Sequence, residues 1–259
     1  MAKRNTRIGG AVAAIAAAAI VATAPPAAAQ SADMGSGGSN DGSSWDGGST
    51  GGSFCGTTPV FPILSWGWLP LDGRAPKFVP NPDTPGGTGS GALDFGVAST
   101  SETVSYYHPT RTALVQAGGL AFSAYLEEGN VAPSYQLKVL GAERTDTGDG
   151  AAVGFTSLVW EPHYNGGNPP ADTWQTFTAL EEGQWWSTRD IAGATGRQRV
   201  SLEAIKAANP NARITSYGLQ VGSGASASTQ FADNVTFGCT NWDFEVLPSL
   251  SSGSASSGS

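Results

Sequence analysis

The chain has 259 residues, of which 36 are glycine and 16 are proline, and only 13% of the residues are charged. So many turn-forming residues and so few charges exclude a coiled coil or a solvated helical bundle, while a hydrophobic content of 39% still allows a folded core. The formal net charge of −8 argues against a nucleic-acid partner, because neutralising phosphates takes a surplus of Lys and Arg.

The first 29 residues have the pattern of a Sec-type signal peptide. A basic start at residues 3–7 precedes an uncharged stretch at 8–23, and small residues up to Ala29 form a cleavage site. The uncharged stretch is too short and too rich in alanine for a membrane span, which needs about 20 apolar residues. No other segment is apolar enough, so we expect cleavage near Ala29 and a secreted mature protein without a membrane span.

Two Ser/Gly-rich segments flank the middle of the chain. Residues 30–53 and 249–259 contain almost no large apolar side chains, so they cannot bury enough surface to offset the entropy cost of ordering. We expect both to be flexible tethers. Residues 54–248 contain no internal linker, which favours a single domain. The sequence indicates no oligomeric state.

The two cysteines of the chain, Cys55 and Cys239, lie near the two ends of this middle segment. The oxidising environment of an exported protein favours a disulfide between them. For so long a loop, the chain-entropy model gives a stabilisation of at most about 5 kcal/mol. Two buried thiols are the alternative.

Short runs in which apolar and polar residues alternate recur between clusters of turn-forming residues. In chain order they predict strands at residues 92–97, 103–107, 120–126, 135–140, 155–160, 174–180, 214–221, 231–237 and 242–246. So many short strands with such turns predict an all-β protein, an antiparallel β-sandwich.

One stretch has a helical pattern. Ser201 can cap a short helix over residues 202–208, which Pro210 would follow. Leu202 and Ile205 lie three residues apart and share one face of this helix, so we expect them to pack on the rim of a sheet. The helix would then be a crossover between two strands.

Seven motifs between Trp66 and Glu245 occur in a specific order and spacing. They are residues 85–95 (PGGTGSGALDF), 158–165 (LVWEPHYN), 174–177 (WQTF), 185–188 (WWST), 207–212 (AANPNA), 217–224 (YGLQVGSG) and 232–237 (ADNVTF). With these motifs the chain resembles a group of exported actinobacterial proteins that are similar to carbohydrate-binding and lectin-like modules of the laminin G or concanavalin type. The resemblance implies a jelly-roll sandwich and an exported protein, and it carries over no catalytic residue.

The residues themselves assign no catalytic group either. Nucleophilic hydrolysis needs a base beside the nucleophile, but His108 and His163 each adjoin a proline and are expected in surface loops. No Gly-x-Ser-x-Gly elbow occurs. Glycoside hydrolysis needs two carboxylates across a cleft, and only Glu161, between Trp160 and Pro162, stands out.

Five aromatic residues within one third of the sequence point to a glycan ligand. They are Trp160, Tyr164, Trp174, Trp185 and Trp186. Sugar rings stack on aromatic faces, and Trp gives the largest apolar platform with a polar N–H. Alternation along a strand places Trp185 and Trp186 on opposite faces, so one of the two needs a ligand or a covering loop. The alternative is that all five rings fill the interior of the sandwich.

The resemblance also implies a structural Ca²⁺ ion as the one cofactor to consider. Related jelly rolls often bind Ca²⁺ through a carboxylate in the final strands, a place that Asp233 matches. Oxygen atoms from Asp233, with Asp94 or backbone carbonyls, would suit this ion. The alternative for Asp233 is a side chain that forms hydrogen bonds within its own turn.

Together these features predict a secreted, non-catalytic β-sandwich protein, a carbohydrate-binding or lectin-like module whose partner is a polysaccharide or cell-wall glycan. A structural or adhesive cell-surface protein without a small ligand is one alternative. A glycoside hydrolase is the other.

Overall fold

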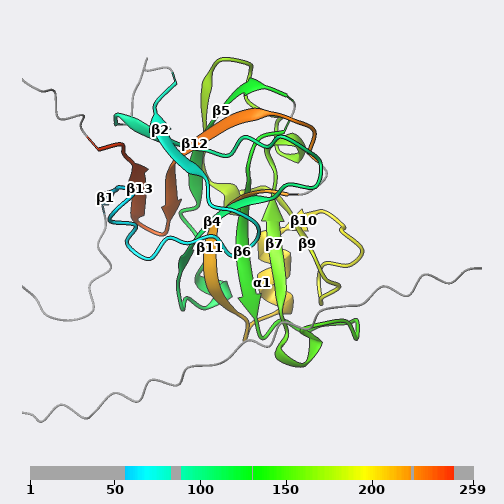
Figure 1. Cartoon of the computed structure of the whole chain (residues 1–259). Coiled ribbons are helices and arrows are strands. Elements are labelled where there is room, and N and C mark those ends of the chain that lie inside the picture. Colours follow the sequence, from blue (N-terminus) through cyan, green and yellow to red (C-terminus); the bar gives the residue numbers. More distant parts are fainter. Residues whose placement is uncertain (1–55, 83–88, 130, 223–224, 248–259) are drawn as a thin grey trace, which may run out of the picture. The chain divides into compact units, whose positions relative to one another are not determined.

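The computed structural model of the chain describes residues 56–82, 89–129, 131–222 and 225–247 (Figure 1). The predicted signal peptide, both predicted tethers and Cys55 lie outside the described residues. Two sheets and one α-helix account for the regular structure of the described part.

One layer is a six-stranded sheet in the order β10-β9-β7-β6-β11-β4. Its strands are β4 (Val104–Pro109), β6 (Ser134–Leu140), β7 (Thr156–Trp160), β9 (Gln184–Ser187), β10 (Val200–Ser201) and β11 (Arg213–Val221). Every neighbouring pair in this sheet is antiparallel.

The other layer is a seven-stranded sheet in which β12 pairs with β13, β3 and β5. Its strands are β1 (Gly56–Val60), β2 (Lys77–Pro80), β3 (Gly91–Asp94), β5 (Ala121–Glu128), β8 (Trp174–Phe177), β12 (Thr229–Phe237) and β13 (Thr240–Phe244). Strand β1 runs parallel to β13, with Gly56 opposite Thr240, whereas the other strand pairs of this sheet are antiparallel.

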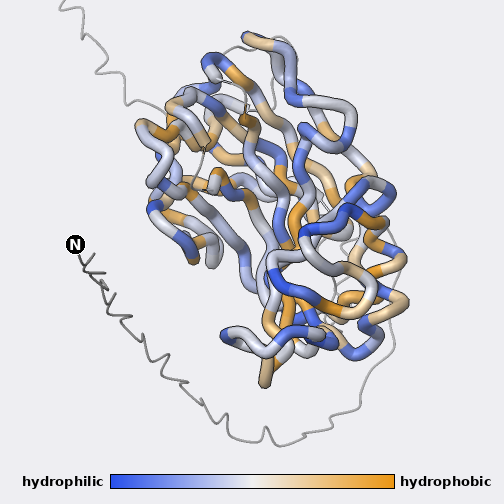
Figure 2. The backbone as a smooth tube through the Cα atoms, turned by 90° about the vertical axis from the view of Figure 1, so that its right-hand side faces the viewer, coloured by the Kyte–Doolittle hydropathy of each residue, from blue (hydrophilic) through white to orange (hydrophobic). Residues whose placement is uncertain are grey.

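The core lies between the two sheets and follows from the alternation along the strands. In β6, Tyr135, Leu137 and Val139 are fully buried and belong to one large hydrophobic cluster. Their neighbours Gln136 and Lys138 point away from the core, because successive strand residues face opposite sides of a sheet. Figure 2 shows hydrophobic and hydrophilic positions alternating along the strands. The fold is an all-β sandwich, as the alternation predicts.

The helix α1 (Leu202–Ala208) has the predicted bounds and the predicted cap. The Oγ atom of Ser201 accepts a hydrogen bond of 3.2 Å from the N–H of Ala204, and both Leu202 and Ile205 are fully buried. Four short 3₁₀ helices lie in the connections: η1 (Leu114–Gln116), η2 (Ala151–Val153), η3 (Pro162–Tyr164) and η4 (Leu180–Glu182). Within the described residues, no helix has the length and apolarity that a membrane span requires.

All nine predicted strands overlap a strand of the structure, but β1, β2, β9 and β10 were not predicted. Strands β1 and β2 each pair with one neighbour and contain a proline, Pro59 in β1 and Pro80 in β2. Proline weakens the sequence signal of a strand, yet an edge strand tolerates it because one side needs no hydrogen-bond partner.

The prediction of a surface-loop position for His108 was wrong. His108 lies in β4, with its ring centroid 4.5 Å from that of Trp242 and 5.6 Å from that of Trp68. Burial lowers the pKa of His108. Pro109 is the last residue of the strand and does not mark a separate turn. His163, in contrast, is exposed in η3, as expected.

Cys239 lies between β12 and β13 and is disulfide-bonded. Its carbonyl oxygen accepts a hydrogen bond of 3.0 Å from the N–H of Gly56, the residue that follows Cys55 in the sequence. Because Cys55 lies outside the described residues, the pairing of the two cysteines stays a prediction.

Candidate functional site

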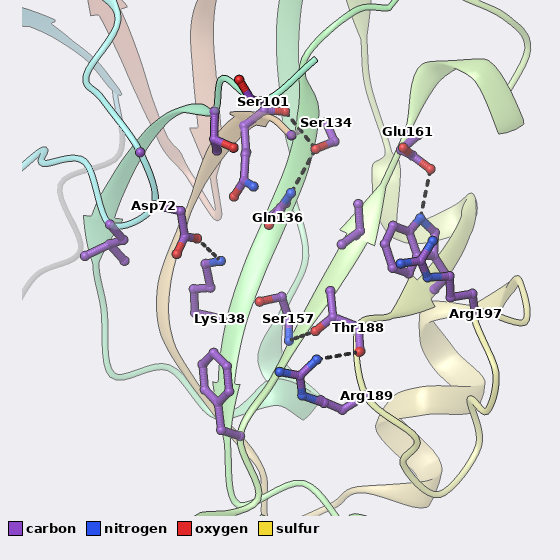
Figure 3. A pocket seen from close by; sticks show the side chains of 18 residues that line it. Asp72, Ser101, Ser134, Gln136, Lys138, Ser157, Glu161, Thr188, Arg189 and Arg197 are labelled. Carbon is purple, nitrogen blue, oxygen red and sulfur yellow. Dashed lines mark hydrogen bonds and ion pairs between the residues drawn. The ribbon is translucent and has the colours of Figure 1, made fainter. Parts of the chain in front are cut away.

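The outer face of the six-stranded sheet, the face turned away from the core, carries a pocket of about 920 Å³ (Figure 3). In register, Trp186 of β9 lies opposite Val159 of β7, and Val159 lies opposite Gln136 of β6. Residues opposite each other in paired strands project from the same face. The floor of the pocket is therefore formed by outward-facing side chains of four strands, namely Ser134, Gln136, Lys138, Ser157, Val159, Trp186 and Gln220.

Residues 71–73 form one wall of this pocket. The backbone N–H groups of Leu71 and Asp72 donate hydrogen bonds to Oγ of Ser105, at 3.2 Å and 3.0 Å. Gly73 has a φ of +73°, and a Cβ atom there would collide with the carbonyl group of Thr103, so this position requires glycine. The wall places Oδ2 of Asp72 2.6 Å from Nζ of Lys138.

A buried tyrosine fixes the two amide groups of the floor. The hydroxyl of Tyr107 lies 2.8 Å from Oε1 of Gln136 and 2.6 Å from Oε1 of Gln220. A phenol has one proton to donate, so one of these amides must turn its NH₂ group to the hydroxyl oxygen. Nε2 of Gln136 also donates to Oγ of Ser134 at 3.0 Å, and Ser134 donates to the carbonyl oxygen of Gln220 at 2.9 Å. The amides therefore have fixed orientations before any ligand binds.

Two smaller pockets continue the main one. The second, of about 280 Å³, shares Glu161, Trp186 and Arg197 with the first. The third, of about 250 Å³, shares Glu161 and Tyr164 with the second. Because neighbouring pockets share lining residues, the three lie side by side, and we call them together the outer groove.

An aromatic ring with an arginine over it occurs at two points of the outer groove. The guanidinium carbon of Arg197 lies 5.4 Å from the ring centroid of Trp186, and that of Arg199 lies 3.9 Å from the ring centroid of Tyr164. Trp186 is half-buried, whereas 43% of the Tyr164 surface is exposed. Both rings therefore remain partly accessible to a ligand.

The main pocket has two carboxylates in its described lining, Asp72 and Glu161, on opposite sides in Figure 3. Asp72 forms the ion pair with Lys138. Glu161, which follows β7, accepts a hydrogen bond of 2.8 Å from the indole N–H of Trp186. Each carboxylate thus has a structural partner in the protein.

The five aromatic residues predicted to bind a glycan do not form one cluster. Trp160 and Trp185 are buried in the core, and the indole N–H of Trp185 donates to the carbonyl oxygen of Leu180 at 2.8 Å. Trp174 belongs to the other sheet, where it packs against the small cluster that contains Tyr125. Only two of the five, Trp186 and Tyr164, line the outer groove.

The residues predicted to bind calcium form hydrogen bonds within the protein. Asp233 is fully buried; its Oδ1 accepts from the N–H of Phe244 at 2.9 Å and its Oδ2 from the side chain of Asn234 at 3.1 Å. Asp94 accepts from the N–H of Gly96 at 2.7 Å. A Ca²⁺ ion binds six to eight oxygens, and a carboxylate oxygen that accepts from an N–H group keeps a lone pair for a metal ion, so the calcium site stays a prediction. Within the described residues, no three His, Cys, Asp or Glu side chains converge on a point suited to a metal ion.

Sequence reasoning missed most of the groove. The polar half of the alternation in β6, at positions 134, 136 and 138, was the available signal, but it is also typical of a plain solvent-facing strand. The three arginines Arg189, Arg197 and Arg199 follow the WWST motif, which ends at Thr188, and this group of cations was a second signal.

No protein-family model and no curated protein matches the chain. Among solved structures, an arabinose-bound GH51 α-L-arabinofuranosidase is similar to it with a TM-score of 0.35 and 11% sequence identity. The similarity covers 71% of this chain and 24% of that enzyme, so the chain spans about a quarter of its length. A similarity at this level assigns neither a family nor an activity.

Proposed function

We propose that this chain is a secreted, non-catalytic glycan-binding module that holds a polysaccharide in the outer groove. The observation that carries the proposal is the composition of the groove floor. Hydroxyl and amide side chains project from three strands of the sheet, β6, β7 and β11, and the tryptophan ring of β9 lies among them. Sugars present hydroxyl groups at their edges and apolar C–H faces, which such a floor and such a ring complement.

The fixed orientation of the floor supports this proposal. Gln136 and Gln220 are held through Tyr107, and the ring of Trp186 is held through Glu161. A binding group that is already oriented loses little conformational entropy when the ligand arrives, so more of the interaction energy remains as affinity. Groups on strands are also positioned more accurately than groups on loops.

The length of the outer groove favours a polymer over a single sugar. Asp72 lines the main hollow and His163 lines the third, and the second hollow shares lining residues with both. The main hollow alone, at about 920 Å³, is at the upper end of the range of small-molecule sites. An extended chain would occupy several hollows at once and gain contacts in each.

The experiment is a glycan array probed with the full-length secreted protein and two tryptophan variants. We expect Trp186→Ala to lose at least tenfold in affinity for the glycans that the unmodified protein binds. The matched control is Trp174→Ala, which removes a partly buried tryptophan from the other sheet. Trp185→Ala is unsuitable because Trp185 fills the core, and its loss is expected to cost about 3 to 5 kcal/mol of stability.

Three results would contradict the proposal. If no glycan binds, a structural or adhesive role accounts better for the protein. If both tryptophan variants lose binding equally, the outer groove is not the site. If bound polysaccharides release reducing ends, the chain is a hydrolase in which Glu161 is the first residue to substitute, because it lines all three hollows.

A further inference from the structure

The outer groove carries three arginines that form no ion pair with a carboxylate among the described residues. Ion pairs within 4.0 Å engage Arg74, Lys138, Arg144 and Lys206. Arg189, Arg197 and Arg199 all line the outer groove, and within the described residues none of them forms such a pair. Asp72 forms an ion pair with Lys138. Glu161 is therefore the one remaining carboxylate in the described lining that can balance the charge of these three arginines.

This local excess of positive charge contrasts with the rest of the molecule. The chain has a formal net charge of −8, so most of its surface repels anions. Binding of an anionic ligand is therefore favoured in the groove and disfavoured on the rest of the surface.

The chemistry of these cations is suited to carboxylates. A guanidinium group presents a planar fork of N–H donors that matches a carboxylate, and it remains effective beside an aromatic ring because it is weakly hydrated. Arg197 lies over Trp186, and Arg199 lies over Tyr164. Each pair thus offers an apolar ring face next to a carboxylate-binding fork, so the same arrangement occurs twice along the groove.

The backbone at Arg197 adds an independent observation. Arg197 has a φ of +60°, a conformation that residues other than glycine rarely adopt and that costs about 1 to 2 kcal/mol. The preceding turn is held by Asp190, whose Oδ1 accepts a hydrogen bond of 2.6 Å from the N–H of Gly196. This turn directs the long charged side chain of Arg197 over the ring of Trp186.

We infer that the outer groove selects acidic glycans, whose sugar rings carry carboxylate groups. The inference rests on the proposed function and names its ligand class. Each carboxylate would be bound by Arg197 or Arg199, and the apolar face of the same or the next sugar would contact Trp186 or Tyr164. Arg189 would bind a further carboxylate in the main pocket, beside Lys138 and Ser157.

The test compares polymers that differ only in charge. Polygalacturonate and alginate are measured against their methyl or propylene-glycol esters, in which the carboxylates are neutral. Dextran sulfate and dextran form the second arm, which separates recognition of a carboxylate from attraction to any polyanion. We expect affinity electrophoresis or calorimetry to show at least tenfold tighter binding of the free acids than of their esters or of dextran sulfate.

Substitutions of Arg197 and Arg199 test whether these two residues cause the preference for free acids. Arg197→Gln and Arg199→Gln should each weaken binding of the free acids about tenfold and binding of the esters less, so that the preference for the free acids falls. Arg111→Gln is the matched control, because Arg111 is exposed and does not line the groove. Arg197→Gly should lose the same affinity while keeping or raising the melting temperature, since glycine adopts a φ of +60° without strain.

The outcomes separate this inference from the proposed function. Equal binding of acids and esters, or binding of neutral glycans alone, would overturn the acidic ligand and leave glycan binding intact. Binding of dextran sulfate as tight as that of polygalacturonate would overturn carboxylate recognition. Absence of binding to every neutral and acidic glycan would overturn both.

Discussion

The indole N–H of Trp186 and Oε2 of Glu161 are joined by a hydrogen bond of 2.8 Å. Trp186 lies in β9 and Glu161 directly follows the neighbouring strand β7, so the bond connects the floor of the outer groove to its rim. Glu161 lines all three hollows, and the bond sets the angle at which the tryptophan ring faces them. The orientation of the ring therefore depends on one carboxylate.

Removal of that carboxylate should weaken glycan binding without unfolding the protein. We expect Glu161→Ala to reduce affinity for neutral glycans about three- to tenfold, because a hydrogen bond worth about 1 kcal/mol no longer orients the ring. The loss should be smaller for acidic glycans, because the change also removes a negative charge from the groove. Glu161→Gln keeps an acceptor oxygen and should lose less. Glu182→Ala, a change to an exposed glutamate outside the groove, is the control. Unchanged affinity in Glu161→Ala, measured by calorimetry, would show that the bond does not position the ring for binding.

The hydroxyl of Tyr107 should contribute to both stability and binding. Tyr107→Phe removes the partner of the Gln136 and Gln220 amides, so we expect a loss of about 1 kcal/mol and a fall in melting temperature of about 2 to 4 °C. Affinity should fall as well, since the amides become free to rotate. Tyr106→Phe is the matched control, because the neighbouring hydroxyl forms no hydrogen bond within the described residues. Equal effects of the two substitutions in thermal unfolding would contradict the network.

Asp243 should make the protein less stable as the pH rises. Burial, the negative charge of Glu245 and a hydrogen bond with it raise the pKa of Asp243 to about 6, from a usual value of 3.8. Because the folded state favours the protonated form, stability is fully present below about pH 4 and falls as the pH rises through 6. Asp243→Asn keeps the neutral form at every pH.

This substitution should therefore raise the melting temperature at pH 8 by about 2 to 4 °C, the effect of about 1 kcal/mol after an allowance for solvent screening. At pH 4 the variant and the unmodified protein should unfold at the same temperature. A stabilisation that is equal at both pH values would mean that the effect is not one of ionisation.

The disulfide predicted for Cys55 and Cys239 has a direct chemical test. Peptide mapping of the purified protein without reductant should give one linked peptide pair containing both residues, because the sequence has two cysteines and Cys239 is disulfide-bonded. Reduction should lower the melting temperature by several degrees, since the closed loop is long. A covalent dimer that reductant separates would show that the bond is intermolecular.

The period-two alternation was sufficient to predict the sandwich, because a sheet with one buried face imposes that pattern on its strands. It located β6 and β11 to within one residue, and the Ser201 cap located α1 with its bounds. The edge strands β1 and β2, each of which contains a proline, were not predicted. At an edge, pairing with a single neighbour determines the strand, and local sequence does not show that neighbour.

The candidate site could be predicted only in part. The alternation argument placed Trp185 and Trp186 on opposite faces, and the structure places Trp185 in the core and Trp186 in the outer groove. It could not show which of the two faces inward, because that depends on how the two sheets pack. The pairing of Arg197 with Trp186 depends on a loop that returns over the sheet, and no periodic pattern shows such a return.

The most direct measurement of the central claim is hydroxyl-radical footprinting of the purified protein with and without a saturating glycan, resolved by mass spectrometry. Binding in the outer groove predicts that oxidation of Trp186 and Tyr164 falls severalfold. Oxidation of Trp174, in the other sheet, and of the exposed Trp66 should not change. Protection of Trp66 or Trp174 with undiminished oxidation of Trp186 would contradict the claim, because the glycan would then occupy another surface.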